Sequence, residues 1–177
     1  HPMEPRSLKY VATACSGELI GGSPETRVRR VCTDSRQLQP EDLFVALEGE
    51  KFDGHRFLPE VTGKGASGVI VNRAKQPESW TGCAVIVVEN TRPALGKLAA
   101  QYRREWPVPI IGVGGSNGKT TTKDLLASVL GEKLKTLSSP ASFNNDIGVP
   151  LTLLALESSH QAAVLEVGTN HPGELAP

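Results

Sequence analysis

The sequence predicts an α/β protein of two domains, and three observations lead to that expectation. Short apolar runs, typical of buried strands, recur between turns rich in glycine and proline. Near the middle of the chain, a stretch with helical spacing of apolar residues is followed by two prolines. Beyond the prolines the pattern becomes strand, glycine-rich turn and helix. We therefore expect a parallel sheet in the second domain.

Four short runs predict the strands of the first domain. They are Arg27 to Cys32, Leu43 to Leu47, Gly68 to Val71 and Ala84 to Val88. The last two are apolar throughout, which suits strands that are buried on both faces. A helix is predicted from about Arg92 to Glu105, with Thr91 as its N-cap. The prolines that follow cannot continue a helix, so we place the two domains at residues 1–106 and 107–177.

The second domain is predicted to begin with a strand at Ile110 to Val113 and a helix at Lys119 to Leu130. The helix carries its apolar residues on one face. They are Leu125, Leu126, Val129 and Leu130. A short helix is predicted at Ile147 to Leu156, and strands near Lys135 to Leu137 and at Ala162 to Val167. So few strands would leave an apolar edge and face of the sheet uncovered.

Composition and charge argue against several classes of function. The chain carries 19 basic and 19 acidic side chains, so its net charge does not favour nucleic acid or an anionic membrane. No apolar run approaches the ~18–20 residues that span a bilayer. The three cysteines, Cys15, Cys32 and Cys83, fit neither a disulfide framework nor a C-x-x-C site. We expect a cytoplasmic protein with no nucleic-acid partner and no membrane insertion.

The most informative segment is the turn from Gly114 to Thr120. Glycines let a loop turn tightly, so that backbone N–H groups and the N-terminus of the next helix face a bound anion. Lys119 would then reach the β- and γ-phosphates of a nucleotide, and the hydroxyl of Thr120 would bind magnesium. Because Val113 stands where the strict pattern has glycine, this is a shortened loop. A glycine-rich turn with a chance lysine is the alternative.

Glu166 is a further candidate, because it follows the apolar run from Ala162 to Leu165. Ligands of open α/β sheets bind beyond the carboxyl ends of the strands, so this carboxylate is placed to hold magnesium. A solvated residue at a strand end is the alternative. We take Lys119, Thr120 and Glu166 as candidate catalytic residues, with Thr120 and Glu166 as metal ligands.

Several separated motifs follow one another along the chain. In the first domain they are Thr33 to Arg36, Asp42 to Leu47 and Phe52 to Phe57. In the second they are Gly115 to Thr121, Phe143 to Leu154 and Glu166 to Glu174. With these motifs the chain resembles the Mur ligases of peptidoglycan synthesis over residues 7–177. One departure is Ser142, which stands where the family usually has asparagine.

The resemblance implies a UDP-binding α/β domain followed by the beginning of a P-loop ATPase-type central domain with a parallel sheet. It also implies ATP and Mg²⁺ as cofactors, and an acyl phosphate formed on the substrate's terminal carboxylate. The motifs favour the family member that adds D-Ala-D-Ala to UDP-N-acetylmuramoyl-tripeptide over the one that adds the third peptide residue. Both substrates are small molecules, and we expect the full-length protein to be a monomer.

The resemblance also implies site residues. For the cofactor they are Gly115, Ser116, Asn117, Gly118, Lys119, Thr120, Thr121, Asn144 and Asn145. For the UDP substrate they are Thr33, Ser35, Arg36, Lys51, Asp53 and His55. Three alternatives stay open: asparagines that act as turn and cap residues, an Asx-type turn with a solvated arginine at 33–36, and a structural His55. For His171 we favour a role in shaping its loop.

Two hypotheses of different classes remain. In the first, the chain is part of the ATP-dependent ligase and its residues take the roles given above. In the second, it is a module that binds UDP-sugar and nucleotide without catalysis. In the family, further catalytic groups lie beyond the residues present here. We therefore predict that this chain has no ligase activity by itself, although it binds a UDP-sugar weakly.

Overall fold

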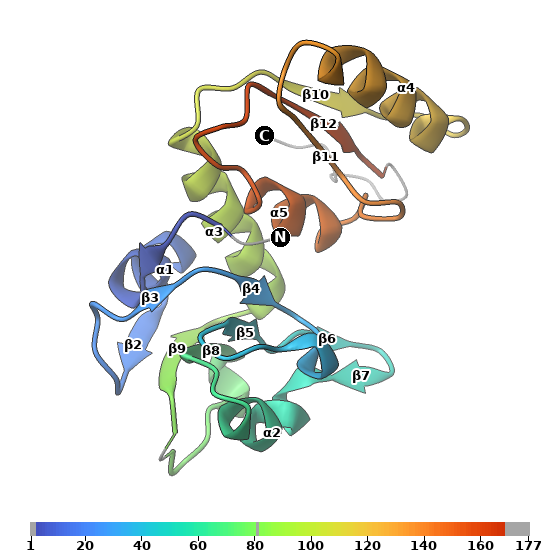
Figure 1. The fold of residues 1–177 in the computed structure, drawn as a ribbon. Coiled ribbons are helices and arrows are strands. Elements are labelled where there is room, and N and C mark those ends of the chain that lie inside the picture. Colours follow the sequence, from blue (N-terminus) through green and yellow to red (C-terminus); the bar gives the residue numbers. More distant parts are fainter. Residues whose placement is uncertain (1–2, 81, 169–177) are drawn as a thin grey trace. The chain divides into compact units, whose positions relative to one another are not determined.

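The computed structural model describes residues 3–80 and 82–168, and the chain divides into two compact units (Figure 1). The first unit is His1–Leu98 and the second is Ala99–Pro177. The division falls inside helix α3 (Thr91–Arg104), which is the helix that the sequence predicts in the middle of the chain. The domain boundary predicted between residues 106 and 107 follows this helix, and it stays a prediction.

A five-stranded sheet forms the centre of the first unit. Its strands, in spatial order, are β2 (Glu18–Ile20), β9 (Ala84–Val88), β8 (Gly68–Asn72), β5 (Leu43–Val45) and β4 (Val31–Cys32). All are parallel except the edge strand β2. Every residue of β8 and β9 is buried, which confirms the prediction made from their unbroken apolar runs.

The run from Arg27 to Cys32 does not form one strand. It divides into β3 (Arg27–Val28), which is antiparallel to β1 (Arg6–Ser7), and β4, which is parallel to β5. Just before β4, the carbonyl of Arg30 accepts the N–H of Leu43 at 2.9 Å. The two halves of the run pair with different neighbours in different sheets, which the apolar pattern could not reveal.

Helices cover both faces of this sheet. Successive side chains of a strand point to opposite faces. On one face, valines of β8 and β9 pack with α2 (Leu58–Gly63). On the other face, Leu8 of α1 (Leu8–Cys15) lies against β8. Helix α1 contacts α3 in turn, because the Cys15 thiol donates to the carbonyl of Ala94 at 3.5 Å. The first unit therefore has three layers, with the sheet in the middle.

Polar segments of the first unit follow the carboxyl ends of its parallel strands. The short helix η1 (Ser35–Gln37) follows β4, and η3 (Arg73–Lys75) follows β8. After β5 come the hairpin strands β6 (Glu48–Gly49) and β7 (Phe52–Asp53), and then the short helix η2 (Gly54–Phe57). Since parallel strands end at the same edge of a sheet, these segments meet there.

Helix α3 begins at Thr91, but this residue is not its N-cap. The side chain of Asn90 accepts the N–H of Arg92 at 3.0 Å. The buried hydroxyl of Thr91 donates instead to the carbonyl of Ala46 at 2.8 Å. The prediction of Thr91 as N-cap is therefore wrong, because a tertiary contact uses its hydroxyl and the neighbouring amide caps the helix.

The second unit contains a parallel sheet of three strands. Their spatial order is β10 (Ile110–Val113), β12 (Ala162–Glu166) and β11 (Thr136–Ser138). Helix α4 (Lys119–Gly131) connects β10 to β11, and α5 (Gly148–Leu153) precedes β12 (Figure 1). The predicted strand, turn and helix are confirmed, whereas the second predicted helix is shorter at both ends. Nowhere in the described chain is a helix long and apolar enough to cross a membrane.

The apolar face of α4 is not covered by the part of the chain that the structure describes. Leu125 is 63% exposed and Val129 is 70% exposed, and Ile111 on strand β10 is 36% exposed. The buried side chain of α4 is that of Lys123, which is 3% exposed. The exposure of Ile111 on the edge strand β10 agrees with the expectation that so small a sheet leaves an apolar edge uncovered, and α4 adds exposed apolar surface of its own.

Candidate functional site

The turn between β10 and α4 has the backbone of a phosphate loop. Gly115 has a φ of 131° and Gly118 a φ of 74°, a region that other residues rarely adopt. A Cβ atom at either position would meet nothing within 4 Å, so the backbone conformation, and not crowding, calls for glycine. The first turn of α4 leaves N–H groups without helical partners, and these groups can face an anion.

The structure places four of the predicted residues at the phosphate loop, and hydrogen bonds join three of them, Thr120, Asn144 and Glu166. The ammonium group of Lys119 folds back over the turn and donates to the carbonyl of Gly115 at 2.8 Å. The hydroxyl of Thr120 donates to Oε2 of Glu166 at 2.8 Å, and the amide of Asn144 donates to Oε1 at 2.9 Å. Both carboxylate oxygens of a buried glutamate are therefore held beside the loop.

The charge state of Glu166 follows from these contacts. The residue is only 3% exposed, and burial, which acts most strongly on it, would raise its pKa. Hydrogen bonds from Asn144 and Thr120, together with the positive charges of Lys119 and Lys123, act in the opposite direction. As a result the pKa of Glu166 lies below its ordinary value, and the carboxylate is ionised at neutral pH.

Two residues that support the site were missed in the sequence. The buried ammonium group of Lys123 donates to the carbonyl of Ser139 at 2.7 Å and pairs with Asp124 at 2.8 Å. The hydroxyl of Ser139, in turn, accepts the N–H of Glu166 at 3.0 Å. A signal was available, since Lys123 lies four residues after Lys119 and so on the same face of α4.

The asparagine pair divides between the two roles that the sequence left open. Asn144 faces Glu166, as described above. The side chain of Asn145 accepts the N–H groups of Ile147 and Gly148, at 3.2 and 2.8 Å, and so begins helix α5. Asn145 therefore acts as a turn and cap residue.

The remaining loop residues predicted to bind the cofactor are Ser116, Asn117 and Thr121, and all three are exposed. Ser142 has a φ of 68°, a conformation that asparagine tolerates better than serine. This gives a physical reason for the asparagine that usually stands at this position. His171 lies outside the described residues.

The donor set beside the loop fits a magnesium ion. Mg²⁺ prefers oxygen ligands and is usually held by one or two carboxylates, together with phosphate oxygens and water. The carboxylate of Glu166 and the hydroxyl of Thr120 supply such oxygens from one place. Across residues 3–80 and 82–168, no three histidine, cysteine, aspartate or glutamate side chains gather closely enough to hold a metal. Phosphate oxygens and water are the usual further ligands of such an ion.

In the first unit, the residues predicted at 33–36 line a pocket of about 510 Å³. Its walls are formed by Thr33, Asp34, Ser35, Arg36, Phe52, Phe57 and Glu60. Asp34 accepts the N–H of Arg36 at 3.0 Å, and its carboxylate binds the guanidinium group at 2.8 and 2.7 Å. The Asx-type turn with a solvated arginine thus exists, and it also forms one wall of a pocket.

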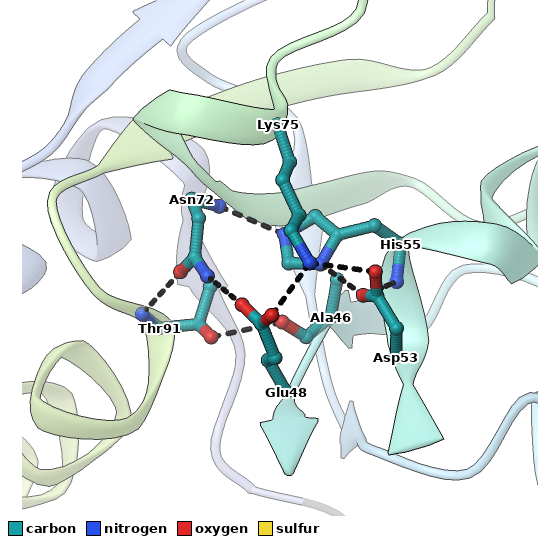
Figure 2. Close-up of polar contacts among 7 residues, drawn as sticks. All are labelled: Ala46, Glu48, Asp53, His55, Asn72, Lys75 and Thr91. Atoms are coloured by element: carbon teal, nitrogen blue, oxygen red, sulfur yellow. Dashed lines mark hydrogen bonds and ion pairs between the residues drawn. The ribbon is translucent and has the colours of Figure 1, made fainter. Parts of the chain in front are cut away.

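The other three predicted substrate residues, Lys51, Asp53 and His55, do not line this pocket. Lys51 is exposed in the hairpin turn. His55 donates from Nδ1 to Asp53 at 2.8 Å, and its Nε2 accepts the N–H of Asn72 at 2.9 Å (Figure 2). With both ring nitrogens used inside the protein, His55 fits the structural alternative. Phe52 and Phe57, which line the pocket, end one of the sequence motifs but were not predicted as substrate residues.

The fold and the loop define the class of the second unit. A parallel strand, a glycine turn and a helix, with a lysine folded over the turn, make it an α/β unit of the P-loop type. Two family models match the chain: "Mur ligase family, catalytic domain" at residues 27–103 and "Mur ligase middle domain" at 113–177. The chain belongs to the Mur ligase family and matches its N-terminal and middle domains over these residues.

Curated relatives agree with this assignment. The chain is 41% identical over 171 residues to the UDP-N-acetylmuramoyl-tripeptide–D-alanyl-D-alanine ligase of Bacillus subtilis (strain 168). This match covers 96% of the chain. It is 39% identical over 170 residues to the enzyme of the same name from Escherichia coli (strain K12). The chain spans 37% and 36% of the lengths of these two relatives.

Solved structures give the same result. A crystal structure of MurF from Acinetobacter baumannii matches with a TM-score of 0.89 and 40% identity, over 98% of this chain and 38% of that one. The MurF ligase of Thermotoga maritima in complex with ADP matches with a TM-score of 0.72 and 34% identity. That match covers 82% of this chain and 33% of the other.

Proposed function

We propose that this chain is the N-terminal and middle part of an ATP-dependent ligase that adds D-Ala-D-Ala to UDP-N-acetylmuramoyl-tripeptide. One observation carries the proposal: Thr120 and Asn144 converge on the ionised carboxylate of Glu166 beside a loop over which Lys119 is folded. Relatives and solved structures that bear the name of this ligase support it, one of them in complex with ADP.

The proposed reaction has two steps. The terminal carboxylate of the tripeptide attacks the γ-phosphorus of ATP, forming an acyl phosphate and releasing ADP. The amine of D-Ala-D-Ala then attacks the acyl carbon and displaces phosphate. Because phosphoryl transfer depends mainly on positioning and on neutralising charge, a loop with a lysine suits the first step.

Each residue beside the loop has a part in that first step. The ammonium of Lys119 and the backbone N–H groups of the loop stabilise charge on the transferred phosphoryl group. Thr120 and Glu166 hold the magnesium ion, which supplies further neutralisation of phosphate charge when bound. Asn144 keeps the carboxylate of Glu166 oriented, since it binds the oxygen that Thr120 does not.

In the first unit we assign the UDP portion of the substrate to the pocket beside η1. The hydroxyls of Thr33 and Ser35 and the guanidinium of Arg36 offer donors for phosphate and sugar oxygens. Phe52 and Phe57 offer aromatic faces for the base. We further propose a cytoplasmic location, supported by three free cysteines, and a monomeric full-length protein.

In this proposal the chain by itself binds ligands without turning them over. Calorimetry tests the nucleotide site: the chain binds ADP in the presence of Mg²⁺, and Lys119→Ala weakens binding roughly tenfold to a hundredfold. Lys133→Ala, an exposed lysine just beyond α4, is the matched control and leaves affinity unchanged. Equal ADP affinity in Lys119→Ala would refute the assignment of the loop.

The absence of turnover is tested separately. The purified chain is mixed with ATP, Mg²⁺, UDP-N-acetylmuramoyl-tripeptide and D-Ala-D-Ala, and the release of inorganic phosphate is followed. We expect no more phosphate release than in a control reaction that lacks D-Ala-D-Ala. Phosphate release that requires both substrates would show that the chain is a complete catalyst.

A further inference from the structure

The hairpin β6–β7 presents two different faces. Phe52 is 48% exposed, lines the pocket, and stacks on Phe57 with ring centroids 5.7 Å apart and planes 21° from parallel. Asp53, the next residue, points to the opposite face because side chains alternate along a strand. There it meets polar side chains from several segments of the first unit (Figure 2). The hairpin thus joins an aromatic wall of the pocket to a polar network behind it.

Lys75 ties the two strands of the hairpin together. Its ammonium donates to Oε1 of Glu48 and to Oδ2 of Asp53, both at 2.7 Å. Glu48 on β6 and Asp53 on β7 lie directly opposite each other, and two like charges in such a pair repel. The hydrogen bond from Lys75, above all, lowers the pKa of Asp53 below its usual range, so the Asp53 carboxylate stays charged near neutral pH. One ammonium therefore offsets the repulsion between the two carboxylates of the hairpin.

Asn72 anchors the same hairpin to the sheet. Its side-chain amide donates to Oε2 of Glu48 at 3.2 Å, and its backbone N–H donates to Nε2 of His55 at 2.9 Å. Its side-chain oxygen accepts the N–H of Thr91 at 2.8 Å, at the start of α3. Asn72 is 9% exposed, and Thr91 is fully buried. The anchor is therefore rigid, because strand β8 and helix α3 both hold it.

We define the hairpin clamp as Glu48, Asp53, His55, Asn72 and Lys75 (Figure 2). We propose that this clamp fixes Phe52 and Phe57 as the aromatic platform for the uracil base, so that Lys75 and Asn72 are positioning residues for the UDP portion of the substrate. The inference rests on the proposed function of the pocket. None of the five clamp residues lines the pocket, so each acts through the hairpin.

The physical reason for a clamp is the cost of ordering a binding surface. A two-stranded hairpin with two residues in each strand is not stable by itself. If Phe52 moved freely, binding of the base would have to order it. The free energy of binding would then become less favourable by the cost of ordering this side chain. A clamp that orders the hairpin beforehand removes this cost.

Calorimetry with UDP tests the proposal on the 177-residue chain. We expect Lys75→Met to weaken UDP binding about tenfold, the size of one lost stacking contact. Lys75→Arg, which keeps a cation able to bridge two carboxylates, restores most of the affinity. Arg73→Met is the matched control, because Arg73 lies on the same short helix and pairs with Glu89 and Glu18, away from the hairpin. It leaves UDP affinity unchanged.

A double-mutant cycle separates positioning from general damage to the unit. In the Phe52→Ala background the platform is already lost, so Lys75→Met should reduce UDP affinity less than twofold further. Hydrogen exchange of amides 48–57 gives a reading that needs no ligand: we expect faster exchange there in Lys75→Met, and unchanged exchange in β8 and β9.

The possible results are distinguishable. If wild type binds UDP and Lys75→Met binds it equally well, or if the effects of the two substitutions multiply fully, the clamp proposal is overturned while the pocket stands. Unchanged exchange of amides 48–57 in Lys75→Met would overturn it as well. If wild type shows no UDP binding at millimolar concentration, the proposed function of the pocket fails, and the role of the platform fails with it.

Discussion

The two units differ in how they bury their apolar surface. In the first, strands β8 and β9 are buried at every position and helices cover both faces of the sheet. In the second, only the central strand β12 is buried throughout, and Leu125 and Val129 of α4 lie exposed in the described chain. Yet both units place polar groups at the carboxyl ends of parallel strands, where ligands of such sheets bind.

This difference indicates which interactions hold each site in place. The site of the first unit rests on a closed apolar core, with a polar network on top of it. The site of the second unit is held mainly by buried polar contacts, which link Lys123, Ser139 and Glu166. Removing apolar volume should therefore damage the first unit more, and removing a single polar partner should damage the second.

The largest effect is expected in the core of the first unit. Phe44 is fully buried in the sheet, and Phe44→Ala should reduce the free energy of unfolding by about 3–5 kcal/mol, because it leaves a cavity. Leu125→Ala, on the exposed face of α4, should change stability by less than ~0.5 kcal/mol. Urea unfolding of the two variants measures both values, and similar losses would refute the contrast between the units.

A smaller effect is expected from the buried lysine of the second unit. Lys123→Met keeps the volume of the side chain but leaves the carbonyl of buried Ser139 without its donor, at a cost of about 1–3 kcal/mol. Hydrogen exchange of β12 amides should become faster. Asp124→Asn is the matched control, because Asp124 is largely exposed and its ion pair contributes little. Equal exchange in Lys123→Met and wild type would contradict the polar support of this site.

The hairpin clamp makes a prediction about acid pH. The pKa of Asp53 is lowered from its usual 3.8, first by Lys75 and then by His55. A carboxyl group with a lowered pKa contributes its full stability above the usual pKa and loses it as the pH falls toward the folded value. The protection of amides 48–57 against hydrogen exchange should therefore decline below about pH 4, and this decline should be smaller in Lys75→Met. A decline of the same size in both proteins would show that the contact between Asp53 and Lys75 does not cause it.

The smallest effect concerns Ser142. Its positive φ is better tolerated by asparagine, so Ser142→Asn should stabilise the second unit by roughly 0.5 kcal/mol or less. Ser158→Asn, at an exposed position outside the positive-φ residues, is a suitable control. Thermal unfolding of the three proteins gives the comparison, and a loss of stability in Ser142→Asn would show that the backbone strain there is unimportant.

Much of the second site could be predicted because its signals are local in sequence. The strand at Ile110 to Val113, the glycine turn and the helix beginning at Lys119 follow one another directly. Glu166 could be placed because it ends a strand of the same sheet. The role of Lys123 was missed, since the apolar spacing drew attention to the leucine-rich face of α4, whereas the structure buries the lysine.

The first site was harder to predict because tertiary contacts assemble it. Glu48, Asp53, Asn72 and Lys75 lie in three segments that meet only where the strands end. The sequence placed Asp53 and His55 near a ligand, but it could not show that their side chains turn toward Lys75 and Asn72 instead. Spacing along a chain carries no information on which face of a hairpin meets which neighbour.

The central claim is that each unit carries its own ligand site. Calorimetry of one set of variants with two ligands, UDP and ADP with Mg²⁺, tests it most directly. The account predicts that Lys119→Ala loses ADP affinity and keeps UDP affinity, whereas Phe52→Ala loses UDP affinity and keeps ADP affinity. A single substitution that weakens both ligands equally would contradict the claim.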